Sequence, residues 1–468
     1  MRFPSLCVLG LGYIGLPTAS TFAIHGLRVA GVDVNRRIVD VLRSGEIHIE
    51  EPGLRGLVQQ AFGSGNLRIV DRAEAADAFL IAVPTPIRAD KRADLDAVRA
   101  AGREIAPLLR PGNLVVLEST SPPRTTVDVL APILAESGLR PGEDFWLTYS
   151  PERVLPGRIL QELVENARVI GGINPASAEA GRDLYSAFVQ GQIVLTDATT
   201  AEMVKLMENT SRDIDLAAAN EFARLADRFG VDVWEAIRLA NLHPRINILR
   251  PGPGVGGHCV SVDPWFLVEA APEQADLVRQ ARLTNDGQPA FAVGLVERAL
   301  GGLQGRRVAA LGLAFKPDVD DLRESPAIEV VRRMVRAGAS VGFYEPHGPE
   351  AAVDGAEGFS SLEAALMGAE AVILLVDHAA FRSLDPSKVA AAMPGRIAVD
   401  LRGAWDRPAW RSAGFDLHVL GVGPSLPQHG GRRGGGRATD RSRPSTAAAE
   451  SFDAPEGAKP PPIRTKNA

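Results

Sequence analysis

The sequence has few cysteines, and it lacks long apolar runs and any regular glycine or proline period. Its 468 residues include two cysteines, Cys7 and Cys259, which excludes a disulfide framework and a metal site built from a cysteine cluster. A reducing, cytoplasmic location is therefore expected. No apolar stretch approaches the roughly 20 residues that span a bilayer, so membrane insertion is not expected. The 47 glycines and 34 prolines follow no period, which excludes a collagen-like chain.

Charge and length narrow the function further. A net charge of −6 gives no case for nucleic-acid binding. Hydrophobic residues make up 45% and charged residues 23%, which is typical of soluble globular proteins. The length predicts about three domains. Residues 424–468 have few large apolar side chains and carry eight Lys/Arg against four Asp/Glu, so this segment is expected to be a disordered tail.

Short apolar runs alternate with amphipathic stretches in two parts of the chain. Runs of this kind are typical of strands buried on both faces, so each part is expected to hold a parallel sheet covered by helices. Between the two parts, residues 200–229 contain no Gly or Pro, which predicts one long helix. The expected fold is α/β, with two Rossmann-like doubly wound parallel-sheet domains joined by a helical middle domain. The expected strands are residues 6–9, 27–32, 78–83, 114–117, 145–149, 307–311, 340–344, 371–376 and 397–401.

A glycine-rich turn directly follows the first expected strand. In its G-x-G-x-x-G pattern, Gly10 permits a tight turn, Gly12 leaves space for a pyrophosphate, and Gly15 lets helix and strand pack closely. The following helix directs free N–H groups and the positive end of its dipole toward the phosphates. Asp33 ends the next expected strand, where a carboxylate holds ribose hydroxyls and repels a 2′-phosphate. NAD is therefore favoured over NADP, although two arginines shortly after Asp33 temper that preference.

The stretch from Gly252 to Asp263 carries the most reactive side chain. Cys259 follows a glycine-rich loop, and a helix expected just after it would lower the thiol pKa and favour thiolate. Asp263, four residues on, could share that face. The alternative is that Cys259 is a small buried hydrophobic residue, as Cys7 is expected to be. A nucleophilic thiol can form a thiohemiacetal that is oxidised to a thioester. An NAD site with such a thiol suggests oxidation of an alcohol to a carboxylate in two steps.

Polar groups in the middle of the chain could complete such a site. Lys205, Asn209 and Arg212 stand at i, i+4 and i+7 of the expected long helix and share a face. A lysine beside an asparagine could act as acid/base or clamp an alkoxide, and a solvated polar face is the alternative. Glu152 and Arg153 follow an expected strand. They could activate water and clamp a ligand, or form a structural ion pair.

These motifs together resemble the UDP-glucose/GDP-mannose dehydrogenase family over about residues 5–405. The motifs that carry the likeness include GLGYIGLP, GVDVN, IAVPTP, LESTSP, SPERVLPG, TAEMVKLMENTSRD, NLHPRINILRPGPGVGGHCVSVDPWF and GLAFKPDVDDLRESPA. The resemblance implies an NAD-dependent UDP-sugar 6-dehydrogenase that oxidises the C6 alcohol to a carboxylate with two NAD. It favours UDP-N-acetyl-D-mannosamine as substrate, with UDP-N-acetyl-D-glucosamine and UDP-glucose as alternatives.

The resemblance also implies roles for single residues. Cys259 would be the nucleophile, Lys205 and Asn209 would handle the oxyanion and protons with help from Asp263, and Glu152 would assist thioester hydrolysis. NAD would be contacted from the glycine-rich turn and from later loops by Gly10, Gly12, Tyr13, Ile14, Gly15, Asp33, Thr85, Thr120 and Arg323. The UDP-sugar would be bound by Arg153, Val154, Lys205, Asn209, Arg212, His243, Arg245, Gly256, Phe315, Lys316 and Arg402.

The same resemblance implies a domain organisation and an assembly. Residues 1–196 would be the NAD-binding domain, 197–300 the helical central and dimerisation domain, 301–423 the UDP-sugar-binding domain, and 424–468 the tail. The protein would be a homodimer built on the central helices, and some loop residues would serve the neighbouring subunit's site. No metal is expected.

Overall fold

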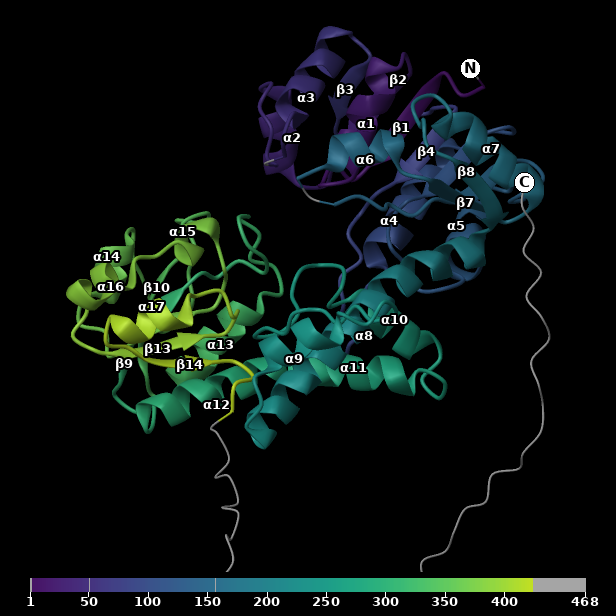
Figure 1. Ribbon diagram of the computed structural model, residues 1–468. Coiled ribbons are helices and arrows are strands. Elements are labelled where there is room, and N and C mark those ends of the chain that lie inside the picture. Colours follow the sequence, from purple (N-terminus) through teal and green to yellow (C-terminus); the bar gives the residue numbers. More distant parts are fainter. Residues whose placement is uncertain (1, 50, 156, 424–468) are drawn as a thin grey trace, which may run out of the picture. The chain divides into compact units, whose positions relative to one another are not determined.

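The computed structural model of the chain describes residues 2–49, 51–155 and 157–423. The tail expected at residues 424–468 lies outside the described residues. The described chain forms two β-sheets, each covered by helices, and a run of helices lies between them in sequence. The expected fold class is therefore confirmed. In Figure 1 the first sheet is purple to teal and the second is green to yellow.

The first sheet has eight strands in the order β3-β2-β1-β4-β5-β6-β7-β8. All neighbouring strands are parallel except β6 and β7, which pair antiparallel. The five strands expected from apolar runs are present as β1, β2, β4, β5 and β6. The strands are β1 (Ser5–Leu9), β2 (Arg28–Val32), β3 (Leu67–Val70), β4 (Ala78–Ile81), β5 (Leu114–Leu117), β6 (Trp146–Tyr149), β7 (Arg168–Gly172) and β8 (Ile193–Asp197).

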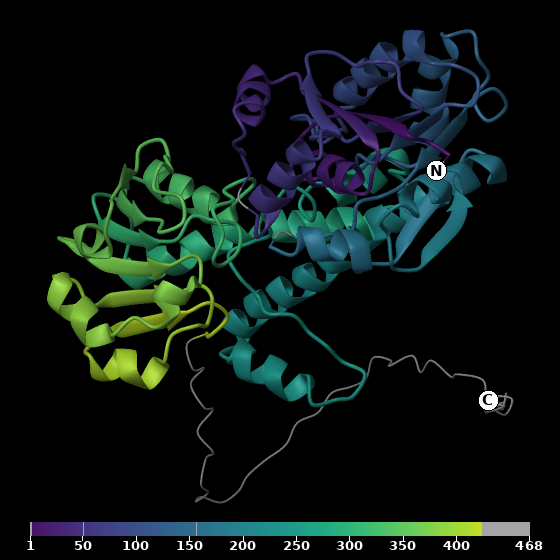
Figure 2. The same cartoon turned by 90° about the horizontal axis from the view of Figure 1, so that it is seen from above.

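Helices cover both faces of this sheet because alternate residues of each strand point to opposite faces. Leu6 and Val8 of β1 join the core under α1, α3 and α7, whereas Cys7 and Leu9 join the core under α4 and α5. Figure 2 shows the sheet between these two layers. The helices are α1 (Gly15–Ile24), α2 (Arg36–Arg43), α3 (Leu54–Gly63), α4 (Asp96–Ile105), α5 (Ala131–Ala135), α6 (Ile159–Glu165) and α7 (Pro175–Tyr185), with a 3-10 turn at Ala106–Leu108 and a π-helix at Thr125–Leu130.

The expected long helix is α8 (Ala198–Phe229), a single helix of 32 residues. It begins where the Asp197 carboxylate accepts the backbone N–H of Thr200, and it ends at Gly230, whose φ of 68° suits a glycine. It packs against α11, partly through Asn220, which donates to Asn285 (2.9 Å). The other helices of this part are α9 (Val233–Ala240), α10 (Asp263–Ala270), α11 (Asp276–Asp286) and α12 (Gln288–Leu300).

The second sheet is parallel throughout, in the order β11-β10-β9-β12-β13-β14. Helices α12 and α13 cover one face and α14 to α17 cover the other. Its strands are β9 (Arg307–Leu311), β10 (Ser340–Tyr344), β11 (Glu357–Gly358), β12 (Ala371–Leu374), β13 (Ile397–Asp400) and β14 (Asp416–Val419). Its further helices are α13 (Pro326–Arg336), α14 (Leu362–Leu366), α15 (Ala379–Arg382), α16 (Pro386–Ala392) and α17 (Arg407–Ser412).

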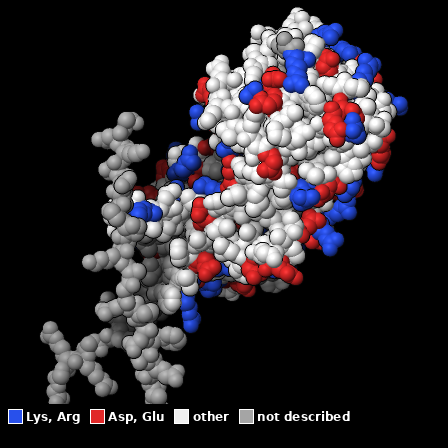
Figure 3. Space-filling model, turned by 90° about the vertical axis from the view of Figure 1, so that its right-hand side faces the viewer, with Lys and Arg blue, Asp and Glu red and all other residues white. Residues whose placement is uncertain are grey.

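The described surface mixes charges of both signs. On the face drawn in Figure 3, basic and acidic side chains are interspersed among the described residues, unlike the basic stripe that tracks a nucleic-acid backbone. No helix in the described part of the chain combines the length and apolar character that a bilayer crossing requires.

Candidate active site

The glycine-rich turn between β1 and α1 has the geometry of a phosphate cradle. A Cβ on Gly10 would lie 2.5 Å from the Ala82 carbonyl oxygen, and one on Gly15 would lie 1.8 Å from that of Gly10. By contrast, a Cβ on Gly12 would meet no atom within 4 Å. Gly10 and Gly15 are therefore required by backbone packing, whereas the space beside Gly12 is open to a ligand. Ile14, the residue before α1, completes the turn.

Three more of the expected NAD residues lie in loops at the carboxyl ends of neighbouring strands. The Asp33 carboxylate accepts the backbone N–H of Leu11 (2.9 Å) and that of Asn35 (2.8 Å), which fixes it beside the glycine turn. The Thr85 hydroxyl donates to the carbonyl of Thr120 (2.6 Å), so the loops after β4 and β5 are joined. A free cradle, a fixed carboxylate and two joined threonine loops fit a dinucleotide with unmodified ribose hydroxyls, as in NAD.

Arg323 reaches this cradle from the loop that precedes α13. Its guanidinium lies 5.1 Å from the centroid of the Tyr13 ring. The Asp321 carboxylate accepts from Arg323 Nε (2.9 Å) and Nη2 (2.6 Å), which holds the guanidinium over the ring. Two residues expected to contact NAD, 310 positions apart in sequence, therefore lie together.

The thiol, the lysine and the asparagine meet at the junction of α8 and α10. Asp263 is the first residue of α10, and its backbone N–H donates to the Cys259 carbonyl (2.8 Å). Asn209 of α8 donates to the Asp263 carboxylate. The charge of Lys205, also on α8, acts on both Asp263 and Cys259. Among the described residues no carboxylate lies within ion-pair distance of Lys205, so its ammonium is free for a ligand.

The expectation that a helix start lowers the Cys259 pKa is wrong. Helix α10 begins only at Asp263, so Cys259 lies in a turn four residues earlier. Burial, together with the negative charge of Asp263, raises the pKa of the thiol to about 11, against the opposing charges of Lys205 and Arg323. Burial also raises the pKa of Asp263 to about 6, although Lys205 and the Asn209 hydrogen bond act in the other direction.

A pocket of about 420 Å³ opens beside α8. Arg153 and Val154 line it together with Lys205 and Asn209, which unites four of the residues expected to hold the substrate. The Arg153 guanidinium pairs with Glu208 of α8 (Nη2 to Oε1, 2.6 Å) and donates to the Ala167 carbonyl (2.9 Å). Arg153 is thus fixed at the pocket rim.

Glu152 faces away from that pocket into a buried ion network. Arg168 donates to Glu152 Oε2 (3.2 Å) and to Glu118 Oε1 (3.0 Å). Tyr185 OH also donates to Glu118 Oε1 (3.0 Å). All these side chains are buried. Burial, and next the nearby Glu152, raise the pKa of Glu118 to about 7, while Arg168 opposes the rise. Glu152 thus makes a structural ion pair, but its partner is Arg168. The adjacent Arg153 pairs with Glu208 instead.

A second, narrow pocket joins residues of the second α/β part with the loop before Cys259. Phe315, Lys316 and Arg402 line it with Gly254. Its volume is about 10 Å³, roughly room for one water, so a nucleotide could enter only after side chains rearrange. Gly256 abuts the same loop, because a Cβ there would lie 2.9 Å from the Phe315 Cβ.

Three of the expected substrate residues lie apart from these pockets. Arg212 is exposed on α8, and His243 and Arg245 are exposed in the loop after α9. The contacts of His243 are local: its backbone N–H donates to the Ala240 carbonyl (3.0 Å), and its Nδ1 accepts the backbone N–H of Arg245 (3.3 Å). None of the three lines either pocket formed by the described residues.

Comparison with known proteins tests the expected family. Three family models cover most of the chain: the NAD binding domain (residues 4–189), the central domain (199–287) and the UDP binding domain (309–407) of the UDP-glucose/GDP-mannose dehydrogenase family. The chain belongs to the UDP-glucose/GDP-mannose dehydrogenase family. Membership confirms the expected enzyme class, an NAD-dependent nucleotide-sugar dehydrogenase, and its cofactor.

Relatives match over nearly their whole length. A UDP-N-acetyl-D-mannosamine dehydrogenase of Methanococcus maripaludis is 45% identical over 431 residues, which cover 89% of this chain and 97% of that protein. An NDP-N-acetyl-D-galactosaminuronic acid dehydrogenase of Ralstonia nicotianae is 49% identical over 416 residues, with 86% and 96% covered. The solved structure of the UDP-D-ManNAc dehydrogenase of Pyrococcus horikoshii superposes with a TM-score of 0.84 at 42% identity and covers 90% of this chain and 99% of that one.

Sequence reasoning missed the residues that orient the site. Asp321, which clamps Arg323, and Glu208, which pairs with Arg153, stand next to expected site residues and could have been found by that proximity. Arg168 could have been found by a different signal, because it is a charged residue at the start of an apolar run. In the folded chain its exposed fraction is 5%. Such a residue in a strand requires buried partners.

Proposed function

We propose that this chain oxidises the C6 alcohol of UDP-N-acetyl-D-mannosamine to the carboxylate in two NAD-dependent steps through a covalent bond to Cys259. The observation that carries the proposal is the cluster of Lys205, Asn209 and Asp263 around that thiol. NAD, when bound, accepts one hydride in each oxidation. The cradle at Gly12, with Asp33 and the loops of Thr85 and Thr120, would hold it.

Each residue of the cluster has a defined task. Asp263, with its pKa raised to about 6, is suited to accept the proton of the C6 hydroxyl near neutral pH. The Lys205 ammonium and the Asn209 amide would stabilise the negative oxygen that develops. The Cys259 sulfur then bonds to the aldehyde carbon, and the thiol proton goes to the aldehyde oxygen, which gives a thiohemiacetal.

Hydrolysis of a thioester to Cys259 completes the proposed reaction. Oxidation of the thiohemiacetal leaves a thioester, and attack by water breaks the carbon–sulfur bond and regenerates the thiol with release of the uronate. The balance is one alcohol, two NAD and one water to one carboxylate, two NADH and three protons. Glu152 is proposed to assist the attack by water, which requires that it turn from Arg168 toward the thioester.

The names of the relatives support N-acetyl sugars as substrates. UDP-N-acetyl-D-mannosamine is the substrate in the names of several whole-length relatives. The name of the Ralstonia relative, at 49% identity, favours an N-acetylgalactosamine sugar as the second candidate. The two candidates differ in the configuration of sugar carbons and not in the chemistry at C6.

A panel of substrates tests the proposal. Purified full-length protein is given NAD and one of UDP-N-acetylmannosamine, UDP-N-acetylgalactosamine, UDP-N-acetylglucosamine or UDP-glucose, and kcat/KM is compared with the mass of each product. We expect the highest kcat/KM and a uronate product with the mannosamine sugar. A higher kcat/KM with another sugar would overturn the substrate, and an aldehyde product would overturn the mechanism.

We also propose that the chain forms a homodimer along α8. This helix exposes large apolar side chains, including Met207 (56% exposed), Phe222 (44%) and Phe229 (60%), which are unusual on a free surface when they lie on one element. The exposed His243 and Arg245 would then serve the neighbouring subunit's site. Sedimentation of the protein should give a dimer mass, and Phe222→Glu should shift it toward the monomer. A monomeric wild-type protein would contradict the proposal.

A further inference from the structure

One buried pair of side chains holds the loop that carries Phe315 and Lys316. Glu345 follows β10 and is 3% exposed, and His378 follows β12 and is fully buried. Glu345 Oε2 accepts the backbone N–H of Leu313 (2.6 Å) and of Ala314 (3.0 Å), just before Phe315. The same oxygen lies 3.1 Å from His378 Nε2.

The other ring nitrogen of His378 holds the far end of the loop. Its Nδ1 accepts the backbone N–H of Asp318 at 2.8 Å. An accepting Nδ1 carries a lone pair, so the ring proton is on Nε2 and is donated to Glu345. Residues 313, 314 and 318 are thus tied to one Glu345–His378 unit, and Phe315 and Lys316 lie inside the closed segment.

The backbone at Asp318 depends on this unit. Asp318 has a φ of 60°, in the left-handed region that few residues other than glycine adopt. Its carboxylate is also tied down, because Oδ1 accepts the backbone N–H of Ala379 (2.8 Å) and Arg382 lies 3.5 Å from Oδ2. Hydrogen bonds at both ends compensate for the unfavourable conformation.

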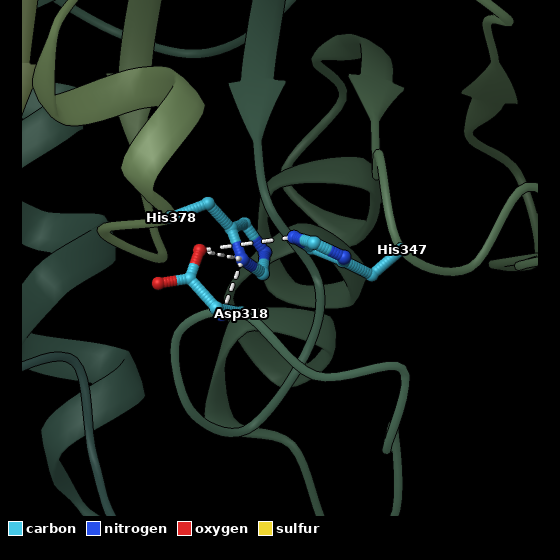
Figure 4. A group of neighbouring side chains, drawn as sticks. All are labelled: Asp318, His347 and His378. Atoms are coloured by element: carbon cyan, nitrogen blue, oxygen red, sulfur yellow. Dashed lines mark hydrogen bonds and ion pairs between the residues drawn. The ribbon is translucent and has the colours of Figure 1, made fainter. Parts of the chain in front are cut away.

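Figure 4 shows that Asp318, His347 and His378 lie close together, and their ligand-type atoms are within 4.8 Å of one another. Such a set could hold a transition metal. However, the His378 Nδ1 lone pair that a metal would need already accepts the Asp318 N–H, and the Arg382 guanidinium beside Asp318 repels a cation. The geometry therefore favours a hydrogen-bonded support of the loop.

The supported loop leads directly to the expected substrate groups. Phe315 and Lys316 share the narrow pocket with Arg402, and Arg402 Nε donates to Asp377 (2.8 Å), the residue before His378. The end of β12 therefore positions Arg402 through Asp377 and the Phe315–Lys316 segment through His378. A shift of the segment after β12, which carries Asp377 and His378, would therefore alter both sides of the pocket.

We propose that Glu345 and His378 are positioning residues for the UDP part of the substrate, acting through the loop of Phe315 and Lys316. The inference rests on the proposed function, because it takes Phe315 and Lys316 as groups that bind the UDP-sugar. It predicts that a defect in the pair changes affinity for UDP-sugar far more than affinity for NAD. The loop touches Asp321 through one backbone hydrogen bond, from the Phe315 N–H to the Asp321 carbonyl (3.1 Å), whereas the Asp321 carboxylate holds the Arg323 side chain directly.

Two substitutions of His378 separate its two hydrogen bonds. In His378→Asn the amide oxygen takes the place of Nδ1 and can still accept from Asp318. In His378→Gln the amide nitrogen takes the place of Nε2 and can still donate to Glu345, but the Asp318 N–H is left without an acceptor. His347→Gln is the matched control. It keeps the backbone N–H that His347 donates to Glu345 (2.9 Å) and removes only a ring that lies 4.8 Å from the His378 ring and 3.7 Å from Asp318, outside hydrogen-bond distance.

The test measures UDP binding by calorimetry, KM for the UDP-sugar and for NAD, kcat, and melting temperature, all on the full chain. We expect His378→Gln to raise the UDP Kd and the sugar KM about tenfold, as loss of one hydrogen bond allows. His378→Asn should change them less than His378→Gln does, and kcat and KM for NAD should stay within about twofold in both variants. His347→Gln should match the wild type.

Three results would overturn the inference. They are an unchanged UDP Kd in His378→Gln, an equal rise in KM for NAD, and stoichiometric Zn²⁺ binding to the wild type that His347→Gln abolishes. If the wild type binds UDP but oxidises no sugar in the panel, the proposed function fails while the Kd values still decide the inference. If the wild type does not bind UDP, both fail.

Discussion

The guanidinium of Arg323 lies 5.1 Å from the centroid of the Tyr13 ring and is held there by both carboxylate oxygens of Asp321. The contact joins the loop before α13 to the glycine-rich turn after β1. The charge of Arg323 also lowers the pKa of Cys259, although burial outweighs it. A single side chain therefore connects the cradle for NAD with the thiol.

Replacing Arg323 should weaken NAD binding specifically. Arg323→Met removes a cation beside the cradle, and we expect KM for NAD to rise about tenfold while the UDP Kd is unchanged. Arg336→Met is the control, because Arg336 pairs with Glu329 on the exposed side of α13. An unchanged KM for NAD in Arg323→Met would contradict the assignment of Arg323 to the cofactor.

The glycines of the turn should separate folding from cofactor binding. Gly12→Ala adds a methyl group to open space, so the melting temperature should stay near that of the wild type while the NAD Kd rises at least about tenfold. Gly15→Ala should instead lower the melting temperature, because its Cβ would lie 1.8 Å from the Gly10 carbonyl oxygen. Calorimetry and thermal unfolding distinguish the two, and normal NAD binding by Gly12→Ala would contradict the cradle.

The raised pKa of Cys259 predicts slow alkylation in the absence of ligands. With a pKa of about 11, the thiol is protonated at neutral pH, and its alkylation rate should rise about tenfold per pH unit up to that value. Asp263→Asn removes a negative charge that raises this pKa, so the rate at pH 8 should increase, by about tenfold if the pKa falls by one unit.

Cys259→Ser provides the blank for the alkylation measurement, because Cys7 is fully buried in β1. Labelled sites are identified by mass spectrometry. A rate that is already high at pH 7 in the wild type, or a lower rate in Asp263→Asn, would show that another group controls the thiol.

The buried Arg168 should be important for stability. Arg168→Met leaves Glu118 and Glu152 buried without a cation, and loss of one partner from such a network costs about 3–5 kcal/mol of unfolding free energy. Arg182→Met on α7 breaks only the exposed pair with Glu179, which is worth at most about 1 kcal/mol. Equal melting temperatures for the two variants would contradict the structural role of the network.

Much of the fold was predictable because its central strands are apolar on both faces. All four residues of β4 and of β5 are buried, so each forms a continuous apolar run. Edge strands give no such run: β3 alternates buried and exposed residues, and β8 is only partly covered. β7 was missed for another reason, since it begins with the buried Arg168 and ends in two glycines.

Residues of the candidate site could be predicted where the chemistry requires a particular residue type. Properties of the site that depend on packing could not. The glycine turn, Asp33 and Cys259 stand out because each has a chemical reason to be there. The pKa of Cys259 could not be predicted, because it depends on the start of α10 and on burial by distant segments. The Glu345–His378 hydrogen bond could not be predicted from the sequence for the same reason, since the two residues are 33 positions apart and come together only when the second sheet forms.

The stoichiometry of NADH tests the central claim most directly. A limiting, known amount of UDP-N-acetylmannosamine is converted to completion with excess NAD, and the NADH formed is measured at 340 nm. The thiol mechanism predicts two NADH per sugar in the wild type and no acid product in Cys259→Ser. One NADH per sugar in the wild type would contradict the four-electron oxidation through Cys259.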